Sequence, residues 1–551
     1  MFQRYFQVCF LCVCVYILFI FCDIFKMKSS TMRRYLDLEK QFVALAAPMC
    51  FVVVVQLGLA MVTVMFAGMI DEDTLAGVGL ANTVYNVFQF SLMYGYSSVI
   101  DTYGPQVFGS LKERNHLGTV LIKVLLQGFL VWLISLGPYL NLVYFLRFMA
   151  PATQEFEVVI VRAVMYFRIT CGLGLLDFIY DALGKYLSIQ GMQKSIYCLS
   201  TVTLGFHIIY NYILIVELGL GVVGLGLACI ATRLTGLAFA GVYLLHKRST
   251  LAWAGFTPQV WQNWSEMVKL GLSGSMNIFA EMGVYEVATF LTQYIGQTAL
   301  NTTLIFFQYC CITWAFGMGI AYSTSVLLGK ALAQHDKEGS IMIMKLAVTN
   351  AFLLGLTISF LEYGLRFELP KLFSEDEAVR AMTASITWIV ALNVTIENVQ
   401  TCLSRGILVG FGKQRFIAVV LVILAYGVNT PLTFVSVFVA KLGPEGIWLN
   451  LLAFCLMSGC INGVKLLFFI DLDRELENVK ERVDLTTTSI SGEEAINSDK
   501  LSIEGSYGAI CENGDKRNIP CATSQAYKKG LLFLLAGVWS CSLLGISLLK
   551  G

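Results

Sequence analysis

The chain has 551 residues, of which 57% are hydrophobic and only 14% are charged, and its formal net charge is +1. Soluble proteins are typically about 45–50% apolar and about 25% charged, so too few charged side chains are present here to cover a water-facing surface of this size. The balanced charge also excludes a general basic bias towards nucleic acid. Composition therefore predicts an all-α membrane protein with many spans, whose partner is the lipid bilayer.

Residues 1–40 form an N-terminal segment with an aromatic, cysteine-rich apolar run over 6–25. We interpret this run as an accessory segment without a functional role. An additional span, a signal-like segment, and a start at Met27 or Met32 are the alternatives.

Apolar blocks long enough to cross a bilayer follow one another along most of the chain. A spanning helix needs about 20 apolar residues, and twelve blocks of that kind are predicted near residues 42–69, 75–100, 118–147, 153–188, 194–216, 221–245, 265–295, 298–329, 340–366, 377–408, 414–439 and 446–470. The polar composition of residues 471–527 predicts a disordered cytoplasmic tail. A thirteenth helix is predicted over 528–551.

The twelve spans are predicted to be two copies of six. Gly109 and Gly329, and likewise Gly191 and Gly410, recur at a period of about 220 residues in equivalent loops. An even number of helices per copy keeps both copies in the same orientation, related by a pseudo-two-fold axis along the membrane normal. We therefore expect an N-lobe over 41–247, with helices 1–6, and a C-lobe over 248–470, with helices 7–12.

The distribution of basic residues orients the predicted bundle. By the positive-inside rule the loops rich in lysine and arginine are cytoplasmic. They are predicted to hold Lys112 and Arg114, Lys185 and Lys194, Lys247 and Arg248, Lys330 and Lys337, and Arg405, Lys413 and Arg415.

Carboxylates inside apolar spans are the strongest functional signal, because a charge at bilayer depth costs about 2.5–3.5 kcal/mol or more. In span 265–295, Asn277, Glu281 and Tyr285 recur every four residues on one helix face, and Glu286 lies beside them. In span 377–408, Asn393 precedes Glu397 by one turn. These residues are predicted to border a cavity.

The first copy offers weaker candidates. Asp177 stands one repeat before Glu397, and Asn82, Asn86 and Asn211 belong to polar stripes on other spans. The alternative is structural, since polar side chains also hold transmembrane helices together by hydrogen bonds. For Asp177 the structural alternative is an ion pair with Arg162 or Arg168.

Buried carboxylates also suggest a mechanism. Burial disfavours the charged form of a carboxyl group, so such a group can exchange protons near neutral pH. A proton removes the charge that attracts an organic cation, and mutually exclusive binding of the two is the minimum that antiport requires. Neighbouring aromatic side chains can stack on a delocalised or quaternary cation.

Over residues 40–470 the chain resembles the multidrug and toxin extrusion family, especially its animal-type members. The resemblance is carried by EMGVYEVATFL (281–291), GKALAQHD (329–336), TIENVQTCLSRGILVGFGKQ (395–414) and IDTYGPQVFGSLK (100–112). It implies two six-helix lobes, a thirteenth helix after the polar tail, and proton-coupled efflux of organic cations and xenobiotics.

The resemblance also assigns site residues and marks departures from the family pattern. The acidic positions match Glu281, Glu286 and Glu397, while the fourth is occupied by Gln308, which cannot titrate. The aromatic pair expected after the first glutamate is replaced by Met282 and Gly283. Thr63 stands where many bacterial members have an aspartate in the first helix, which weakens an argument for sodium coupling.

Several alternatives are weighed against a monomeric cation/proton antiporter in the plasma membrane. A flippase of the same broad fold, a sodium-coupled exporter, a receptor or channel, and an acidic organelle as the location are the competitors. An ATP-driven pump is disfavoured because no GxxxxGK[ST] loop is present. Four scattered histidines argue against a metalloenzyme, so no cofactor or metal is expected beyond the proton as coupling ion.

Overall fold

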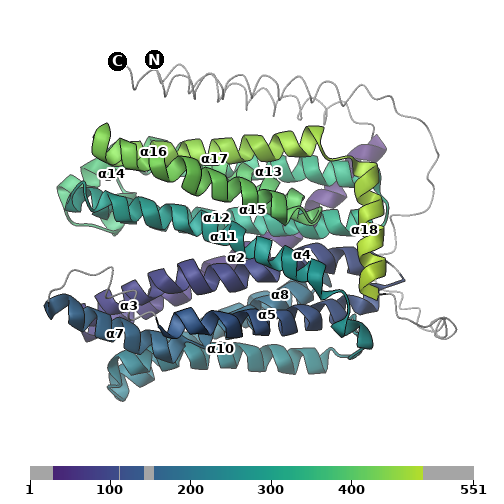
Figure 1. Ribbon diagram of the computed structural model, residues 1–551, viewed down its shortest axis with the longest axis horizontal. Coiled ribbons are helices and arrows are strands. Elements are labelled where there is room, and N and C mark those ends of the chain that lie inside the picture. The colour runs from purple at the N-terminus through teal and green to yellow at the C-terminus, as the bar shows by residue number, and fades with distance from the viewer. Residues whose placement is uncertain (1–28, 111, 142–153, 488–551) are drawn as a thin grey trace. The chain divides into compact units, whose positions relative to one another are not determined.

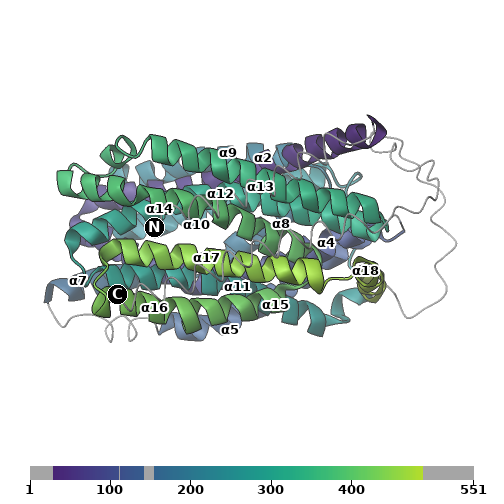
Figure 2. The ribbon, with the colours of Figure 1, turned by 90° about the horizontal axis from the view of Figure 1, so that it is seen from above.

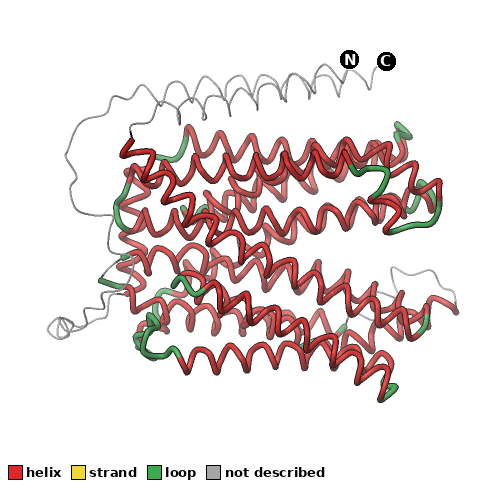
Figure 3. Tube along the Cα trace, turned by 180° about the vertical axis from the view of Figure 1, so that it is seen from behind, coloured by secondary structure: helices red, strands yellow, loops and turns green. Residues whose placement is uncertain are grey.

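The computed structural model describes residues 29–110, 112–141 and 154–487, and Figure 3 shows helices and connecting loops throughout this part of the chain. The main helices of the first half are α2 (Ser29–Ile70), α3 (Glu72–Val84), α4 (Ser91–Gly109), α5 (Leu117–Leu140), α7 (Gln154–Thr170), α8 (Leu173–Ile189), α9 (Gln193–Asn211) and α10 (Gly221–His246). Those of the second half are α11 (Trp264–Thr292), α12 (Gln297–Ala333), α13 (Lys337–Gly364), α14 (Glu377–Thr401), α15 (Gln414–Val422), α16 (Thr430–Phe434), α17 (Gly443–Phe468) and α18 (Leu472–Thr487). The predicted apolar run 6–25 and the predicted thirteenth helix lie outside the described residues.

Within the described ranges, nine helices are long and apolar enough to cross a membrane, or ten if the bent pair α7–α8 is counted as one span. Their outer faces expose large apolar side chains such as Met65, Ile134 and Leu245, which a water-soluble monomer would not display in such numbers. The two other predicted spans, 75–100 and 265–295, are helical as well and richer in polar side chains. The structure therefore describes an all-α, multi-pass membrane protein.

Several predicted spans are interrupted by a bend or by a wider helical stretch. The span predicted over 153–188 consists of α7 and α8, which bend by 46° at a break that contains Gly172. The span predicted over 75–100 contains a wider, π-helical stretch, η1 (Tyr85–Phe90), between α3 and α4. Wide turns of this kind are common near functional sites. Another one, η6 (Cys402–Leu408), follows α14, and η3 (Tyr212–Glu217), η7 (Ile423–Asn429) and η8 (Val435–Val439) are of the same kind.

The helices of the two halves of the chain gather into separate layers in Figure 1, and Figure 2 shows the same helices from above. The halves meet where α4 contacts α11 and α12, and where α2 contacts α12. A Cβ atom on Gly109 would lie 2.8 Å from the Cα of Lys330, and one on Gly329 would lie 2.8 Å from the Cβ of Pro105. These two repeat-related glycines therefore allow α4 and α12 to cross at close range.

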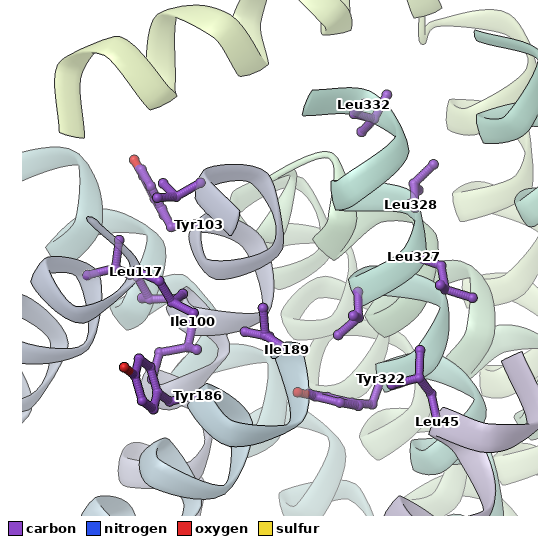
Figure 4. Packing of buried hydrophobic residues seen from close by; sticks show 14 of the residues in the cluster. Leu45, Ile100, Tyr103, Leu117, Tyr186, Ile189, Tyr322, Leu327, Leu328 and Leu332 are labelled. Carbon is purple, nitrogen blue, oxygen red and sulfur yellow. The ribbon is translucent and has the colours of Figure 1, made fainter. Parts of the chain in front are cut away.

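A shared apolar core joins the two halves around this crossing. Figure 4 shows side chains of this cluster, among them Leu45 from α2, Ile100 from α4, Ile189 from α8 and Leu328 from α12. All four are no more than 5% exposed. Two smaller apolar clusters lie within the first half and within the second half.

The predicted disorder of residues 471–527 is wrong for the first part of that segment. Residues Leu472–Thr487 form α18, which crosses the ends of the neighbouring helices in Figure 1. Leu476, Val479 and Val483 are spaced three and four apart on one face and are at most 8% exposed, and Glu475 pairs with Lys413 at 2.7 Å. The acidic average composition hides this buried stripe, because only every third or fourth residue is apolar.

A capping residue outside the spans fixes the start of α3. The Asp71 side chain accepts a hydrogen bond from the backbone N–H of Thr74 at 2.6 Å, as an N-cap does. Hydrogen bonding from Thr74 lowers the pKa of Asp71, and the nearby Arg162 guanidinium, 3.7 Å away, acts in the same direction. The ionised form of Asp71 is therefore the form that stabilises this loop.

Candidate functional site

Glu281 lies on the inner face of α11 and is only 6% exposed. One carboxylate oxygen forms an ion pair with the guanidinium of Arg405. The other accepts a hydrogen bond from the indole N–H of Trp314 on α12, at 3.2 Å. The charge of Glu281 is thus neutralised inside the second half of the chain.

Glu397 lies on α14, also 6% exposed, and its contacts are of a different kind. Its Oε1 accepts a hydrogen bond from the Tyr285 hydroxyl at 3.2 Å, and its Oε2 accepts one from the Asn393 amide at 3.3 Å. Tyr285 is one turn from Glu281 on α11, so the two predicted stripes face each other. No described residue forms an ion pair with Glu397, which therefore sits among neutral donors.

The placement of Arg405 corrects an expectation from the sequence. Its positive charge assigned it to a cytoplasmic loop, but it belongs to η6, and its side chain is only 12% exposed. The positive-inside rule counts charges and takes no account of buried partners. The available signal was its position in an apolar helical run only eight residues after Glu397.

One predicted coupling residue, Glu286, and one predicted cavity residue, Gln308, lie apart from this network. Glu286 is half-buried on α11 and forms no hydrogen bond or ion pair with a described residue. Because it follows Glu281 by five residues, it points to a different side of the helix. Gln308 is exposed on α12, on the same face as the exposed Leu304 and Ile312. Neither side chain contributes to the setting of Glu397.

Packing explains why the aromatic pair of the family pattern is replaced by Met282 and Gly283. A Cβ atom on Gly283 would collide with the Tyr426 hydroxyl, which approaches the α11 backbone from η7 (Ile423–Asn429) and donates to the carbonyl of Phe279 at 3.3 Å. The space beside the first glutamate is therefore filled by an aromatic ring from another helix.

In the first half, Asp177 is structurally paired. It forms an ion pair with Arg233 on α10 and accepts a hydrogen bond from the Tyr85 hydroxyl. The ion-pair partner is neither Arg162 nor Arg168, which the sequence offered as candidates. Asp177 is the positional counterpart of Glu397 but, unlike Glu397, it has a cationic partner.

The remaining predicted asparagines do not join the Glu397 network. Asn211 donates to the carbonyl of His207 at 2.8 Å, and His207 bonds to Thr63 and Thr232 at 3.0 and 2.8 Å, so these residues connect α2, α9 and α10. This arrangement favours the structural interpretation of Asn211. Asn82 is half-buried and Asn86 is exposed, and neither side chain bonds to a described residue.

A cavity lies between the two halves, lined by residues of α2, α4, α8, α11, α12 and η6. Its empty space, including the part open to solvent, is about 620 Å³. Asn277, Arg405, Asp101 and Lys185 are among the lining residues. Lys185 was predicted in a loop but is buried in α8, and its spacing from Asp181, four residues earlier, was the sequence signal for a paired lysine.

Hydrogen bonds link the two halves of the chain at the end of the bundle that lies nearest to α18. The distribution of basic residues predicts that this end is cytoplasmic. Thr102 donates to the carbonyl of Val409 at 2.7 Å, and Gln106 donates to the carbonyl of Gly410 at 2.9 Å. Lys330 donates to the carbonyl of Ile189 at 2.7 Å. We call these three donors and their acceptors the cytoplasmic seal.

The geometry describes a buried carboxylate held by two neutral donors, and a cavity between the two halves whose lining includes Arg405, the ion-pair partner of Glu281. Among the described residues there is no group of three or more histidine, cysteine, aspartate or glutamate side chains that could hold a metal ion.

Comparison with known proteins places this arrangement in a family. The family model for MatE matches residues 48–213 and again residues 275–435, one match in each half of the chain. Multidrug and toxin extrusion protein 1 of Oryctolagus cuniculus is 25% identical over 462 residues, which cover 82% of this chain and 79% of the relative. Multidrug and toxin extrusion protein 2 of Homo sapiens is 27% identical, covering 74% and 73%.

Solved structures share the fold. The eukaryotic MATE transporter AtDTX14 matches with a TM-score of 0.76 and 18% identity, covering 82% of this chain and 99% of that one. A MOP superfamily transporter from Pyrococcus furiosus matches with a TM-score of 0.69 and 15% identity, covering 82% and 97%. The twice-matched family model and the two-lobed arrangement agree, and this chain belongs to the MatE family of multidrug and toxin extrusion transporters.

Proposed function

We propose that this chain is a secondary active transporter that exports organic cations and xenobiotics in exchange for protons, by alternating access of its two lobes. The observation that carries the proposal is the setting of Glu397, a buried carboxylate held by two neutral donors with no cationic partner among the described residues. The names of the mammalian relatives, multidrug and toxin extrusion proteins, support the export of xenobiotics.

In this mechanism Glu397 exchanges a proton for the positive charge of the substrate. An ionised carboxylate in a site of low dielectric attracts a cation strongly, and protonation removes that attraction. Tyr285 and Asn393 orient the carboxyl group, since each donates to a different oxygen. Glu286, which also has no cationic partner among the described residues, is the second carboxylate proposed for coupling.

Glu281 is given a different role. Because its charge is already balanced by Arg405, an incoming cation gains less there than at Glu397. We assign Glu281 to holding Arg405 at the wall of the cavity. The cytoplasmic seal corresponds in this proposal to a state closed towards the cytoplasm.

Flux into proteoliposomes tests the proposal. Purified protein is reconstituted, a pH gradient of either sign is imposed, and uptake of labelled quaternary ammonium and guanidinium ions is followed. Accumulation is expected only when the lumen is acidic, and a proton ionophore should abolish it. Glu397→Gln should lose the accumulation, whereas Glu377→Gln, a control at the exposed start of the same helix, should keep it.

Other outcomes would overturn it. Uptake that follows a sodium gradient instead of the pH gradient identifies a sodium-coupled exporter. Movement of labelled lipid without cation uptake identifies a flippase. Flux that does not saturate and shows no countertransport identifies a channel.

A further inference from the structure

The lining of the cavity between the lobes includes charged side chains that the proposed coupling mechanism does not use. They are Asp101 and Lys185 on the first half and Arg405 on the second. Asp181 pairs with Lys185 and Glu281 pairs with Arg405, although neither carboxylate is part of the lining. Counted with these two partners, three carboxylates accompany two cations, which leaves an excess of one negative charge. The balance favours a monovalent cation as the ligand of this cavity.

Both basic side chains are already paired with carboxylates, so neither offers an uncompensated positive charge to an anion. Lys185 has three N–H donors, and they are taken by Ser97 Oγ at 2.8 Å, Asp101 Oδ2 at 2.9 Å and Asp181 Oδ2 at 3.4 Å. Arg405 is paired with Glu281.

What the wall does offer is hydrogen-bond acceptors. Oδ1 of Asp101, Oγ of Ser98 and Oδ1 of Asn277 are buried and have no hydrogen-bond partner among the described residues. All three residues line the cavity. Buried polar atoms nearly always have a partner, so three such atoms around one cavity indicate a ligand that donates.

The packing of two helices brings these acceptors to one place. Ser98 and Asp101 are three residues apart on α4, and therefore lie on the same face of that helix. A Cβ atom on Gly274 would collide with the Ser98 hydroxyl, so the α11 backbone passes directly beside it. Asn277 follows Gly274 by three residues and lies on the same side of α11. Its amide N–H₂ donates to the carbonyl of Gln414 at 3.4 Å, so the amide oxygen is the group that has no partner among the described residues.

We propose that this cavity binds the head group of the transported cation and selects groups with several N–H donors, guanidinium or primary ammonium, over quaternary ammonium. This inference rests on the proposed function. A quaternary ammonium has the same charge but no N–H, so it would leave the three acceptors unpaired. The ring of Tyr94, which also lines the cavity, can stack on either kind of cation and so does not discriminate between them.

Binding to the full chain in detergent tests the preference with two matched probes. Benzylguanidinium and benzyltrimethylammonium carry the same apolar group and the same charge, and differ in donors. We expect benzylguanidinium to bind about tenfold more tightly, as one or two charge-assisted hydrogen bonds would give. Benzoate is included as the anionic probe.

Two variants link the preference to the cavity. Ser98→Ala and Asn277→Leu each remove one acceptor, and each should reduce the ratio of the two affinities about three- to tenfold. Ser385→Ala is the matched control, because Ser385 is exposed and its hydroxyl bonds only within its own helix. Thermal melting and size-exclusion profiles identify any variant that fails to fold, and the two substitutions act on different helices.

The outcomes separate this inference from the proposed function. Equal affinity of the two cations, tighter binding of benzoate, or an unchanged ratio in both folded variants overturns the inference, even if proton-driven flux is observed. A ratio that favours benzylguanidinium and falls in the variants supports the inference, even if uptake proves independent of the pH gradient and the proposed function fails.

Discussion

The ion pair between Arg405 and Glu281 permits a quantitative test of how the site is held together. Replacing Arg405 by leucine removes the cation and leaves Glu281, only 6% exposed, with the Trp314 N–H as its remaining partner. Breaking a buried pair from one side typically costs about 3–5 kcal/mol, because an uncompensated charge stays buried. We expect a loss of this size for Arg405→Leu.

The double variant Arg405→Leu/Glu281→Gln should recover most of that loss. It removes both charges, and the glutamine still accepts a hydrogen bond from Trp314. Replacing a buried ion pair by neutral groups is often neutral or stabilising. The coupling energy of the double-mutant cycle should therefore be several kcal/mol and favourable to the pair of substitutions.

Thermal unfolding in detergent, followed by tryptophan fluorescence, measures the effect. An unfolding entropy of about 2.1 cal/mol/K per residue gives roughly 1.2 kcal/mol/K for 551 residues, so the single variant should melt about 3–4 °C lower. The double variant should melt within about 1 °C of the wild type, by the same conversion. Additive shifts, or a single variant as stable as the wild type, would show that the two charges do not interact in the protein.

Three further expectations concern other parts of the chain. Glu286→Gln and Glu397→Gln should each reach the membrane but lose proton-driven flux, and full flux in both would remove them as coupling sites. Asp71→Ala should cost about 1 kcal/mol of stability at neutral pH, because the N-cap of α3 is lost. Folding lowers the pKa of Asp71, so the stabilisation by its carboxylate is present above the ordinary carboxyl pKa and disappears as the pH falls through the lowered pKa. The melting temperatures of the variant and the wild type should therefore converge in acid. Gly283→Phe should lower the melting temperature, because the new ring would overlap Tyr426 and overpacking costs about 1–3 kcal/mol or more. A variant that melts like the wild type would show that Tyr426 moves aside freely.

The class of fold and part of the site followed from the sequence, because both depend on local patterns. Long apolar blocks predicted the spans, and the four-residue spacing on two of them predicted one polar stripe with Glu281 and Tyr285 and another with Asn393 and Glu397. That these two stripes face each other is a finding of the structure. The break between α7 and α8 was not predicted, since a bend of 46° leaves the apolar composition on both sides unchanged.

The missed residues are those whose environment depends on distant partners. Lys185 and Arg405 were assigned to loops because the positive-inside rule treats every basic residue as solvated. Each is in fact buried against carboxylates, and for Arg405 the partner is 124 residues away. Gln308 is the opposite case, a predicted residue that the structure does not place in the site. It matches a family position in the sequence, but its side chain is exposed and outside the Glu397 network.

The cytoplasmic seal sets an energy scale for the transport cycle. Its two neutral hydrogen bonds contribute about 0.5–1.5 kcal/mol each, and a bond from a charged donor such as Lys330 contributes about 1.5–3 kcal/mol. Separating them, with water taking the place of the lost partners, costs on the order of 3–6 kcal/mol. One proton moving through 100 mV releases about 2.3 kcal/mol, and each pH unit adds about 1.4 kcal/mol. A single proton crossing an energised membrane therefore carries free energy of the same order as the hydrogen bonds of the cytoplasmic seal.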